Sequence, residues 1–334
     1  MLFDINPLSE QTPWQRELQQ SITQPAELFD YLQLPDRHLP AAEAACRLFP
    51  LQVTPSFMAR MQKGNWHDPL LRQILPIAAE QQSTPGYLTN PVGDSQAAVI
   101  PGLLHKYHNR VLLLLTGHCA VNCRYCFRRH FAYQDHKLTS GQWQQVMDYL
   151  QQHQIKEVIL SGGDPLTVSD RRLSETMTQL EAMRCVQVVR IHTRLPIVLP
   201  SRITPALTQR LQTSRLKVVM VIHSNHPQEF DVGVDTALQQ LKQAGVLLMN
   251  QTVLLRGIND DVVTLAQLSW RLLAADVLPY YLHVFDKTQN AAHFDLPSEQ
   301  AISLIDKLQQ QLPGYLVPQL VQEQAGQPSK TRMR

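Results

Sequence analysis

The feature that most constrains the fold of this 334-residue chain is a series of short apolar runs that begins at Arg110. The runs are rich in β-branched residues, and stretches with helical periodicity separate them, which is the pattern of repeated βα units. Runs that are apolar on both faces suit parallel strands covered by helices. We expect strands at 110–116, 157–162, 188–193, 217–223, 246–255 and 278–285. Six such units predict an α/β fold, a partial (β/α)6 barrel.

The first hundred residues differ from the rest and are rich in Pro and Gln. A capping side chain followed by proline is a preferred helix start, and this part of the chain has three such pairs. The pairs are Thr12-Pro13, Thr54-Pro55 and Asp68-Pro69. We therefore predict a helical N-terminal region at 1–105, a barrel at 106–325 and a C-terminal tail at 326–334.

Composition and charge exclude several classes of protein. The formal charge of +2 provides no large basic surface, so we expect neither a nucleic-acid nor a membrane partner. The start of the chain, MLFDINPLSE, has no signal-like apolar run, and the longest apolar runs are too short to cross a bilayer. Five cysteines, an odd number, argue against a secreted disulfide framework. We expect a soluble protein in the reducing cytoplasm.

Polar residues and glycines follow each of the six predicted strands. Ligands of such barrels bind at the carboxyl ends of the strands, so these residues predict the site. In chain order they are a cysteine-rich segment, Gly162-Gly163-Asp164-Pro165, Arg194, Ser224-Asn225-His226, Arg256 to Asp261, and Asp286-Lys287.

The most specific of these elements is the segment GHCAVNCRYCFRRH after the first strand. It spaces Cys119, Cys123 and Cys126 as C-x3-C-x2-C. Three thiolates on one loop can hold three irons of a cubane cluster and leave the fourth iron open to another ligand. A zinc site is an alternative, because His118 or His130 could supply a fourth ligand. A chance group of buried thiols is the simplest alternative.

With Phe127 after its last cysteine, this loop resembles that of the radical S-adenosylmethionine superfamily. The resemblance implies that the three cysteines bind a [4Fe-4S] cluster whose open iron binds S-adenosylmethionine. The segment SGGDP resembles the glycine-glycine-acid motif of the superfamily. That likeness implies that Gly162, Gly163 and Asp164 hold the methionyl amine, and glycine permits a close backbone approach.

Longer stretches are similar to the lysine 2,3-aminomutase family, and most similar to its shorter branch, which supplies β-lysine for modification of bacterial elongation factor P. These stretches are NRVLLLLTGHCAVNCRYCFRRHF, VILSGGDPL, RLPIVLPSRIT, SNHPQE, NQTVLLRGIND and PGYLVPQLVQEQAGQPSK. The resemblance implies a pyridoxal 5'-phosphate enzyme that isomerises L-α-lysine to β-lysine, in the (R) form for this branch. It also implies a functional link to elongation factor P and to a separate β-lysine ligase.

The resemblance also assigns residues. Lys330 corresponds to the lysine that forms a Schiff base with pyridoxal 5'-phosphate, and Arg110 to a residue that contacts this cofactor. Arg128 corresponds to the arginine that binds the substrate α-carboxylate, a task that suits a planar guanidinium. Its neighbour Arg129 could be confused with it.

Two acidic residues match the family positions that bind the distal ammonium of the substrate, Asp260 and Glu323. The longer family members have Asp in place of Glu323 and a run of glycines before the lysine, where this chain has AGQPSK. Asp260 could instead cap the helix that follows it, and Asp261 is an equal candidate for the cap.

The residues alone leave two other functions open. In one, the protein is a radical S-adenosylmethionine enzyme without pyridoxal chemistry, and Lys330 belongs to a solvated basic tail. In the other it is a zinc-binding module whose RYCFRRH segment contacts phosphate.

Overall fold

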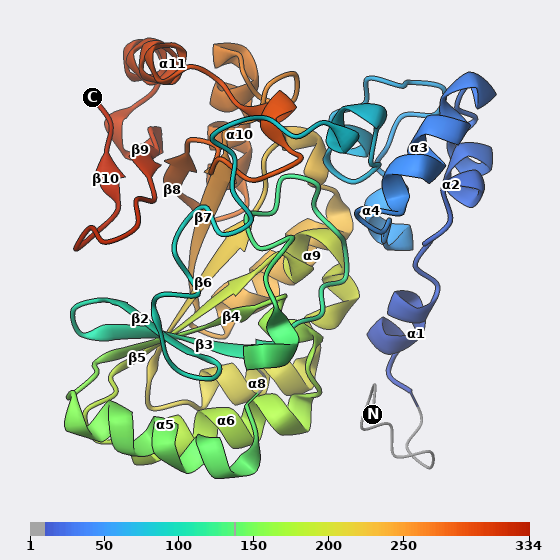
Figure 1. Ribbon diagram of the computed structural model, residues 1–334. Helices are drawn as coiled ribbons and strands as arrows, with labels where there is room; N and C mark the ends of the chain where they lie inside the picture. Colours follow the sequence, from blue (N-terminus) through green and yellow to red (C-terminus); the bar gives the residue numbers. More distant parts are fainter. Residues whose placement is uncertain (1–10, 137) are drawn as a thin grey trace.

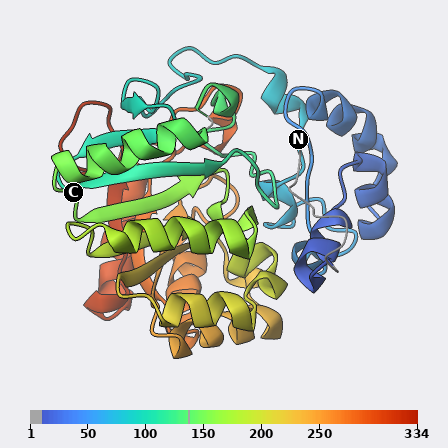
Figure 2. The same cartoon turned by 90° about the horizontal axis from the view of Figure 1, so that it is seen from below.

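The structure is a computed structural model, which describes residues 11–136 and 138–334. The start of the chain, on which the expectation of no signal segment rests, lies outside the described residues. A ten-stranded sheet, with its strands in sequence order, curves into an open barrel that helices cover on the outside (Figures 1 and 2). Within the described residues no helix has the length and apolar character needed to cross a membrane.

The six central strands are parallel neighbours, so the predicted partial (β/α)6 barrel is confirmed. They are β3 (Arg110–Thr116), β4 (Glu157–Gly162), β5 (Val188–Thr193), β6 (Lys217–His223), β7 (Leu247–Val253) and β8 (Leu278–His283). Valines stand in register across the first four, as Val111, Val158, Val189 and Val218. The last two strands end two residues earlier than predicted, where the chain leaves the sheet to form the rim.

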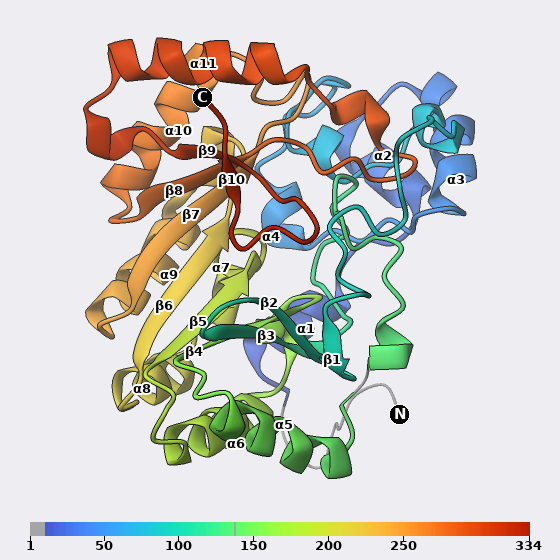
Figure 3. The ribbon, with the colours of Figure 1, turned by 60° about the vertical axis from the view of Figure 1, so that its left-hand side comes forward.

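Four short strands extend the sheet at its edges, and the sequence did not reveal them. They are β1 (Ala98–Ile100), β2 (Leu103–Tyr107), β9 (Gln319–Gln322) and β10 (Thr331–Arg332). Figure 3 shows β1 and β2 at one edge and the β9–β10 hairpin, in red, at the other. The boundary predicted between residues 105 and 106 falls inside β2, and the predicted tail holds β10. Strands of two to five residues carry too little periodicity to be recognised.

The helices between the strands turn one apolar face to the sheet. They are α5 (Ser140–Gln152), α6 (Asp170–Ala182), the short α7 (Leu195–Val198), α8 (Pro205–Gln212), α9 (Val232–Gln243) and α10 (Val262–Ala274), and α11 (Ser298–Gln311) follows β8. On α6 the buried side chains Leu173, Met177 and Leu180 recur at helical spacing. Ser169 caps this helix by accepting a hydrogen bond from the Arg172 amide.

The N-terminal region contains the helices α1 (Pro13–Gln19), α2 (Pro25–Leu32), α3 (Leu39–Cys46) and α4 (Pro55–Met58). Helices start after Thr12 and Thr54, but the helix predicted after Asp68 is absent from the described residues. The Asp68 carboxylate instead accepts hydrogen bonds from the Leu70 and Leu71 amides, at the start of a short 3-10 turn (Leu71–Gln73). Pro76 explains the difference, because a proline disfavours the helical conformation of the residue before it.

The N-terminal region shares one apolar core with the barrel. Trp14 and Phe57 belong to the same buried cluster as Val158 and Leu160 of β4. A second cluster lies between α10, α11 and the strands β8 and β9. The two predicted regions are therefore packed as one body.

A glycine pair at the end of β4 brings this strand against the start of the cysteine segment. The Gly163 amide donates to the Thr116 carbonyl at 2.8 Å, and the Asp164 amide donates to the His118 carbonyl at 2.7 Å. A Cβ atom on Gly162 or on Gly163 would lie 2.3 Å from one of these two carbonyl oxygens. Gly162 also has φ +125°, which favours glycine. The pair is therefore required by the protein backbone, before any ligand is considered.

We predict that Gly163→Ala lowers the free energy of unfolding by about 2 kcal/mol or more, because backbone must move to admit the methyl group. Gly141→Ala is the matched control, since nothing lies within 4 Å of the added atom and the site is in the first turn of α5. The control should leave stability unchanged or raise it by about 0.5 kcal/mol. Urea unfolding measures both, and an unaltered midpoint for Gly163→Ala would contradict the steric argument.

Candidate active site

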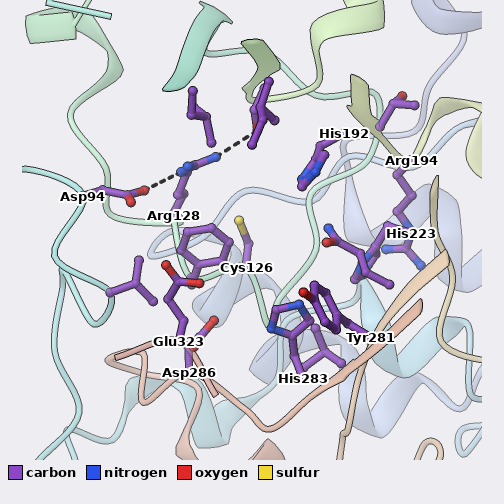
Figure 4. A pocket seen from close by; sticks show the side chains of 18 of the residues that line it. Asp94, Cys126, Arg128, His192, Arg194, His223, Tyr281, His283, Asp286 and Glu323 are labelled. Carbon is purple, nitrogen blue, oxygen red and sulfur yellow. Dashed lines mark hydrogen bonds and ion pairs between the residues drawn. The ribbon is translucent and has the colours of Figure 1, made fainter. Parts of the chain in front are cut away.

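A cavity of about 410 Å³ opens inside the barrel at the carboxyl ends of the strands (Figure 4). This volume suits a small-molecule ligand. Ten of the eleven residues expected at the site line its wall; they are Arg110, Cys119, Cys123, Cys126, Arg128, Gly162, Gly163, Asp164, Glu323 and Lys330. The rim predicted from the strand ends and the C-terminal tail therefore meet in one place.

The three cysteines of the loop are free thiols on the cavity wall. His118 and His130, the candidate fourth ligands of a zinc ion, are exposed and do not line the cavity. Within the part of the chain that the structure describes, no three His, Cys, Asp or Glu side chains gather closely enough to hold one metal ion. The arrangement suits a cluster, whose irons each bind a single thiolate, better than it suits zinc.

Buried charges clamp this loop to the N-terminal region. Glu80, which is fully buried, accepts from Arg124 Nε at 2.5 Å and from Arg129 Nη2 at 2.7 Å. These arginines flank Tyr125 and Cys126. Arg124 also donates to the Arg72 carbonyl at 2.5 Å. The backbone between the last two cysteines is therefore held by ion pairs that solvent does not screen.

Arg194 links the loop to the end of β5. Its Nη1 donates to the Cys123 Sγ at 2.8 Å, and its Nη2 donates to Gln73 at 2.6 Å and to Glu229 at 2.9 Å. Asp164 holds the backbone of this residue by accepting from the Arg194 amide at 2.7 Å. Burial raises the pKa of Asp164 to about 6, although its hydrogen bonds oppose the shift. The acidic residue of the glycine-glycine-acid motif thus positions β5.

A chain of alternating charges begins at Arg128. Its Nε donates to Asp94 Oδ2 at 2.6 Å, and its Nη1 donates to Ser161 Oγ at 3.1 Å. Lys106 lies 2.6 Å from the other oxygen of Asp94 (Figure 4 shows the Arg128–Asp94 pair). Burial alone would raise the pKa of Asp94, but Arg128 and Lys106 outweigh burial and hold this pKa below its usual value. Asp94 therefore stays ionised between two cations.

The same chain of charges reaches the C-terminal tail. Lys106 lies 3.4 Å from Glu323 Oε1, to which the Tyr107 hydroxyl donates at 2.6 Å. Lys330 Nζ donates to the other oxygen, Glu323 Oε2, at 2.6 Å. Burial opposes ionisation of Glu323, yet Lys330 and its hydrogen bond lower the pKa of this carboxyl below its usual value. The tail lysine is thus held inside the site.

The structure does not bring Asp260 to the cavity wall. Its neighbour Asp261 caps α10 by accepting from the Thr264 amide at 2.9 Å, which decides the question of the cap. Asp286, at the end of the segment that leaves β8, lines the cavity close to Glu323 instead (Figure 4). The signal was in the sequence, because this residue follows the sixth predicted strand.

Burial is the main cause of an unusual pKa at Asp286. It raises the pKa of this carboxyl to about 7, while Lys330 acts in the opposite direction. Asp286 therefore changes charge near neutral pH. Burial also keeps three histidines of the wall neutral by lowering their pKa values; they are His192, His223 and His283.

Four buried nitrogen atoms on the cavity wall have no hydrogen-bond partner among the described residues. They are Arg110 Nε, His192 Nε2, Arg194 Nε and His283 Nε2. Buried polar groups are normally paired, so unpaired ones around a cavity indicate a ligand that completes them. Two guanidinium groups and a lysine on one wall favour an anionic ligand.

Comparisons with known proteins show the family. Residues 109–191 match the model of a 4Fe-4S single cluster domain. The chain is 48% identical over 320 residues to L-lysine 2,3-aminomutase of Escherichia coli, with 95% of this chain and 93% of that protein covered. It is 43% identical to the Haemophilus influenzae enzyme of that name, over 97% and 96% of the two chains. This chain belongs to the L-lysine 2,3-aminomutase family.

More distant relatives include the L-lysine 2,3-aminomutase of Clostridium subterminale, 35% identical over 95% of this chain and 77% of that protein. Two solved structures align over a smaller share. A radical SAM methyltransferase from Sphaerobacter thermophilus has a TM-score of 0.47 and 16% identity, over 66% of this chain and 68% of that one. A structure described as native anSMEcpe with bound AdoMet has a TM-score of 0.44 and 11% identity, over 60% and 58%.

The relatives confirm the resemblance drawn from the sequence. The protein is an isomerase of the family that transfers an amino group within lysine. The cofactor set of this family is the expected one, a [4Fe-4S] cluster, S-adenosylmethionine and pyridoxal 5'-phosphate.

We expect Glu80→Gln to lower the free energy of unfolding by about 3 kcal/mol, because it leaves two buried arginines with no counter-charge. Iron bound after anaerobic reconstitution should fall as well, since Arg124 and Arg129 hold the loop. Glu175→Gln is the control, as this exposed glutamate lies 3.9 Å from Arg171 and should change stability by less than about 0.5 kcal/mol. Equal stability of the two variants would rule out the clamp.

Proposed function

We propose that this protein is a radical S-adenosylmethionine, pyridoxal 5'-phosphate-dependent aminomutase that converts L-α-lysine to β-lysine. The observation that supports it best is the meeting of Cys123 and Lys330, from distant parts of the sequence, on one cavity wall. The chain is 48% identical to the Escherichia coli relative and 35% identical to the clostridial one, which supports its membership of the shorter branch of the family. We extend the proposal to an (R)-β-lysine product, to use in modifying elongation factor P, and to a cytoplasmic location that suits free thiols.

The residues of the cavity fit the three groups. Cys119, Cys123 and Cys126 would each bind one iron of the cluster. The segment from Gly162 to Asp164 would face the methionyl part of S-adenosylmethionine. Lys330 would carry pyridoxal 5'-phosphate, with Arg110 and its unpaired Nε toward the anionic cofactor. When bound, these groups supply a carbon-centred oxidant and a conjugated system that stabilises the radical beside the migrating nitrogen.

Side chains of the cavity would bind both ends of the substrate, its α-carboxylate and its distal ammonium. Arg128 would bind the α-carboxylate, with its guanidinium fixed by Asp94 and Ser161. Glu323 and Asp286 would bind the distal ammonium, since Asp286 rather than the expected Asp260 lines the cavity. Two fixed ends hold the carbons between them in place, which is the main contribution that a protein makes when cofactors carry the chemistry.

The remaining wall excludes water and side reactions. The three neutral histidines offer no strong acid at the reacting carbons. The β9–β10 hairpin contributes Glu323 and Lys330 from one edge of the sheet. A reactive radical needs such an enclosed site.

The alternatives are less well supported. A radical enzyme without pyridoxal chemistry would leave Lys330 as a solvated tail residue, whereas its ammonium lies 2.6 Å from Glu323 within the cavity. A zinc-binding module would need His118 or His130 beside the thiols, and neither histidine lines the cavity.

The first test is the position of the cofactor. After loading with pyridoxal 5'-phosphate and reduction with borohydride, we expect a phosphopyridoxyl label on the peptide that contains Lys330, as measured by mass spectrometry. The exposed Lys307 of α11 should stay unlabelled. The loaded protein, given S-adenosylmethionine and a reductant without oxygen, should isomerise L-lysine. Label on a different lysine would disprove the assignment.

A second test uses the titration of Asp286. Because its pKa is about 7, this carboxyl is mostly neutral at pH 6 and mostly ionised at pH 8. An ammonium ligand binds the ionised form, so the affinity of the protein loaded with pyridoxal 5'-phosphate for lysine should rise about tenfold between these pH values and then level off. Asp286→Asn should bind lysine weakly at both, with the rise abolished. Calorimetry measures the affinity, and a pH profile that Asp286→Asn leaves unaltered would exclude the role.

A further inference from the structure

The contact between Lys330 and Glu323 closes the β9–β10 hairpin across its two strands. Gln322 pairs with Thr331 in the ladder, and the two charged side chains come from the residue that follows β9 and the residue that precedes β10. The Lys330 ammonium lies 2.6 Å from Glu323 Oε2, and both side chains are mostly buried, with 24% and 11% of their surfaces exposed. The pair is thus a defined contact inside the cavity.

Both oxygens of Glu323 are occupied in this arrangement. Oε2 receives the Lys330 ammonium, and Oε1 receives the Tyr107 hydroxyl at 2.6 Å, with Lys106 Nζ at 3.4 Å. In a cavity from which water is excluded, a carboxylate is stabilised most by the first cation that binds it. With Lys330 and Lys106 beside it, Glu323 offers little attraction to a further ammonium.

The chemical identity of the two ligands of Glu323 is what makes this contact informative. The side chain of Lys330 and the distal end of the proposed substrate are the same group, four methylenes that end in an ammonium. The protein therefore places a side chain that matches the distal end of the substrate on the carboxylate that is proposed to bind this end. A covalent bond from the Lys330 nitrogen to the cofactor would remove this ammonium from Glu323.

Resting on the proposed function, we propose that Lys330 occupies the distal-ammonium site until the cofactor is attached, so that pyridoxal 5'-phosphate must load before lysine binds at both ends. On loading, the Lys330 ammonium gives one proton to solvent, its nitrogen bonds to the aldehyde carbon, and the aldehyde oxygen leaves as water. Glu323 then has no lysine of the protein beside it. The incoming substrate ammonium takes the same place.

The charged groups around Lys330 and Glu323 favour replacement of the Lys330 ammonium by the substrate ammonium. Asp286, Glu323 and Asp94 are acidic, and Lys330 and Lys106 are the cations that act on Asp286. Since Lys106 is engaged with Asp94 at 2.6 Å, removal of the Lys330 charge leaves Glu323 and Asp286 as the carboxylates that need a cation. In the cofactor-free protein the Lys330 ammonium still neutralises these carboxylates.

The experiment compares the affinity for L-lysine with that for L-norleucine, which has the same carbon chain without the distal amine. Both are titrated calorimetrically into the full-length chain with its cluster reconstituted, either free of pyridoxal 5'-phosphate or loaded with it. We expect a preference for lysine below about twofold in the cofactor-free protein and above about tenfold in the loaded protein, as for a charge-assisted hydrogen bond.

Two variants separate the contact from other effects of loading. Cofactor-free Lys330→Met should bind lysine about tenfold more tightly than cofactor-free wild type, because Glu323 is released. Loaded Glu323→Gln should lose most of the preference for lysine. Lys307→Met on the outer helix α11 is the control and should match wild type.

The inference fails if cofactor-free wild type already prefers lysine about tenfold, as it would if Lys330 did not occupy the site. It also fails if Lys330→Met and wild type, both cofactor-free, bind lysine equally, including no measurable binding by either. Failure of the proposed function gives a different result, in which the loaded protein binds lysine and norleucine alike. A circular dichroism spectrum like that of wild type shows that each variant has folded.

Discussion

The site depends on the close approach of two backbones, the end of β4 and the start of the cysteine loop. Hydrogen bonds of 2.7 and 2.8 Å join them, and the glycine pair leaves no room for a side chain between them. Because Asp164 follows directly and holds the Arg194 amide, the same contact sets the end of β5. Arg194 then reaches Cys123. A single steric constraint thus places three neighbouring strand ends in register.

Compensation of buried charge is the second constraint, and it joins the two ends of the chain to the barrel. The loop carries several cations, and the N-terminal region supplies the acids that neutralise them, Glu80 for Arg124 and Arg129 and Asp94 for Arg128. The helical region is therefore part of the site. A cation buried without these acids would destabilise the barrel by several kcal/mol.

The C-terminal hairpin shows how a short element can bring chemistry to a site. β10 has two residues, yet its pairing with β9 sets Lys330 across from Glu323. Glu323, which holds Lys330, is also proposed to hold the substrate. If Lys330 carries the cofactor, as proposed, loading and substrate binding share one carboxylate. The order in which cofactor and substrate bind would therefore depend on the geometry of the β9–β10 hairpin.

Much of the architecture could be predicted from the sequence because its signals are local. Six β-branched runs predicted β3 to β8, and the proline-capped starts at Thr12 and Thr54 predicted α1 and α4. The spacing of Cys119, Cys123 and Cys126 placed three thiols on one loop, and all three line the cavity. Each of these signals depends on residues that are close in sequence, and the physical preferences of short segments suffice to interpret them.

The tertiary structure decided what depends on contacts between distant segments. It placed Asp286, and not Asp260, at the cavity wall, because Asp261 caps α10 while the segment after β8 turns into the cavity. It also joined β1, β2, β9 and β10 to the sheet and showed that Glu80 and Asp94 neutralise the loop. Local sequence signals specify which chemical groups are present and which segments form helices and strands. Which charges meet was decided by packing, since a buried ion pair forms only where two distant backbones are brought together and water is removed.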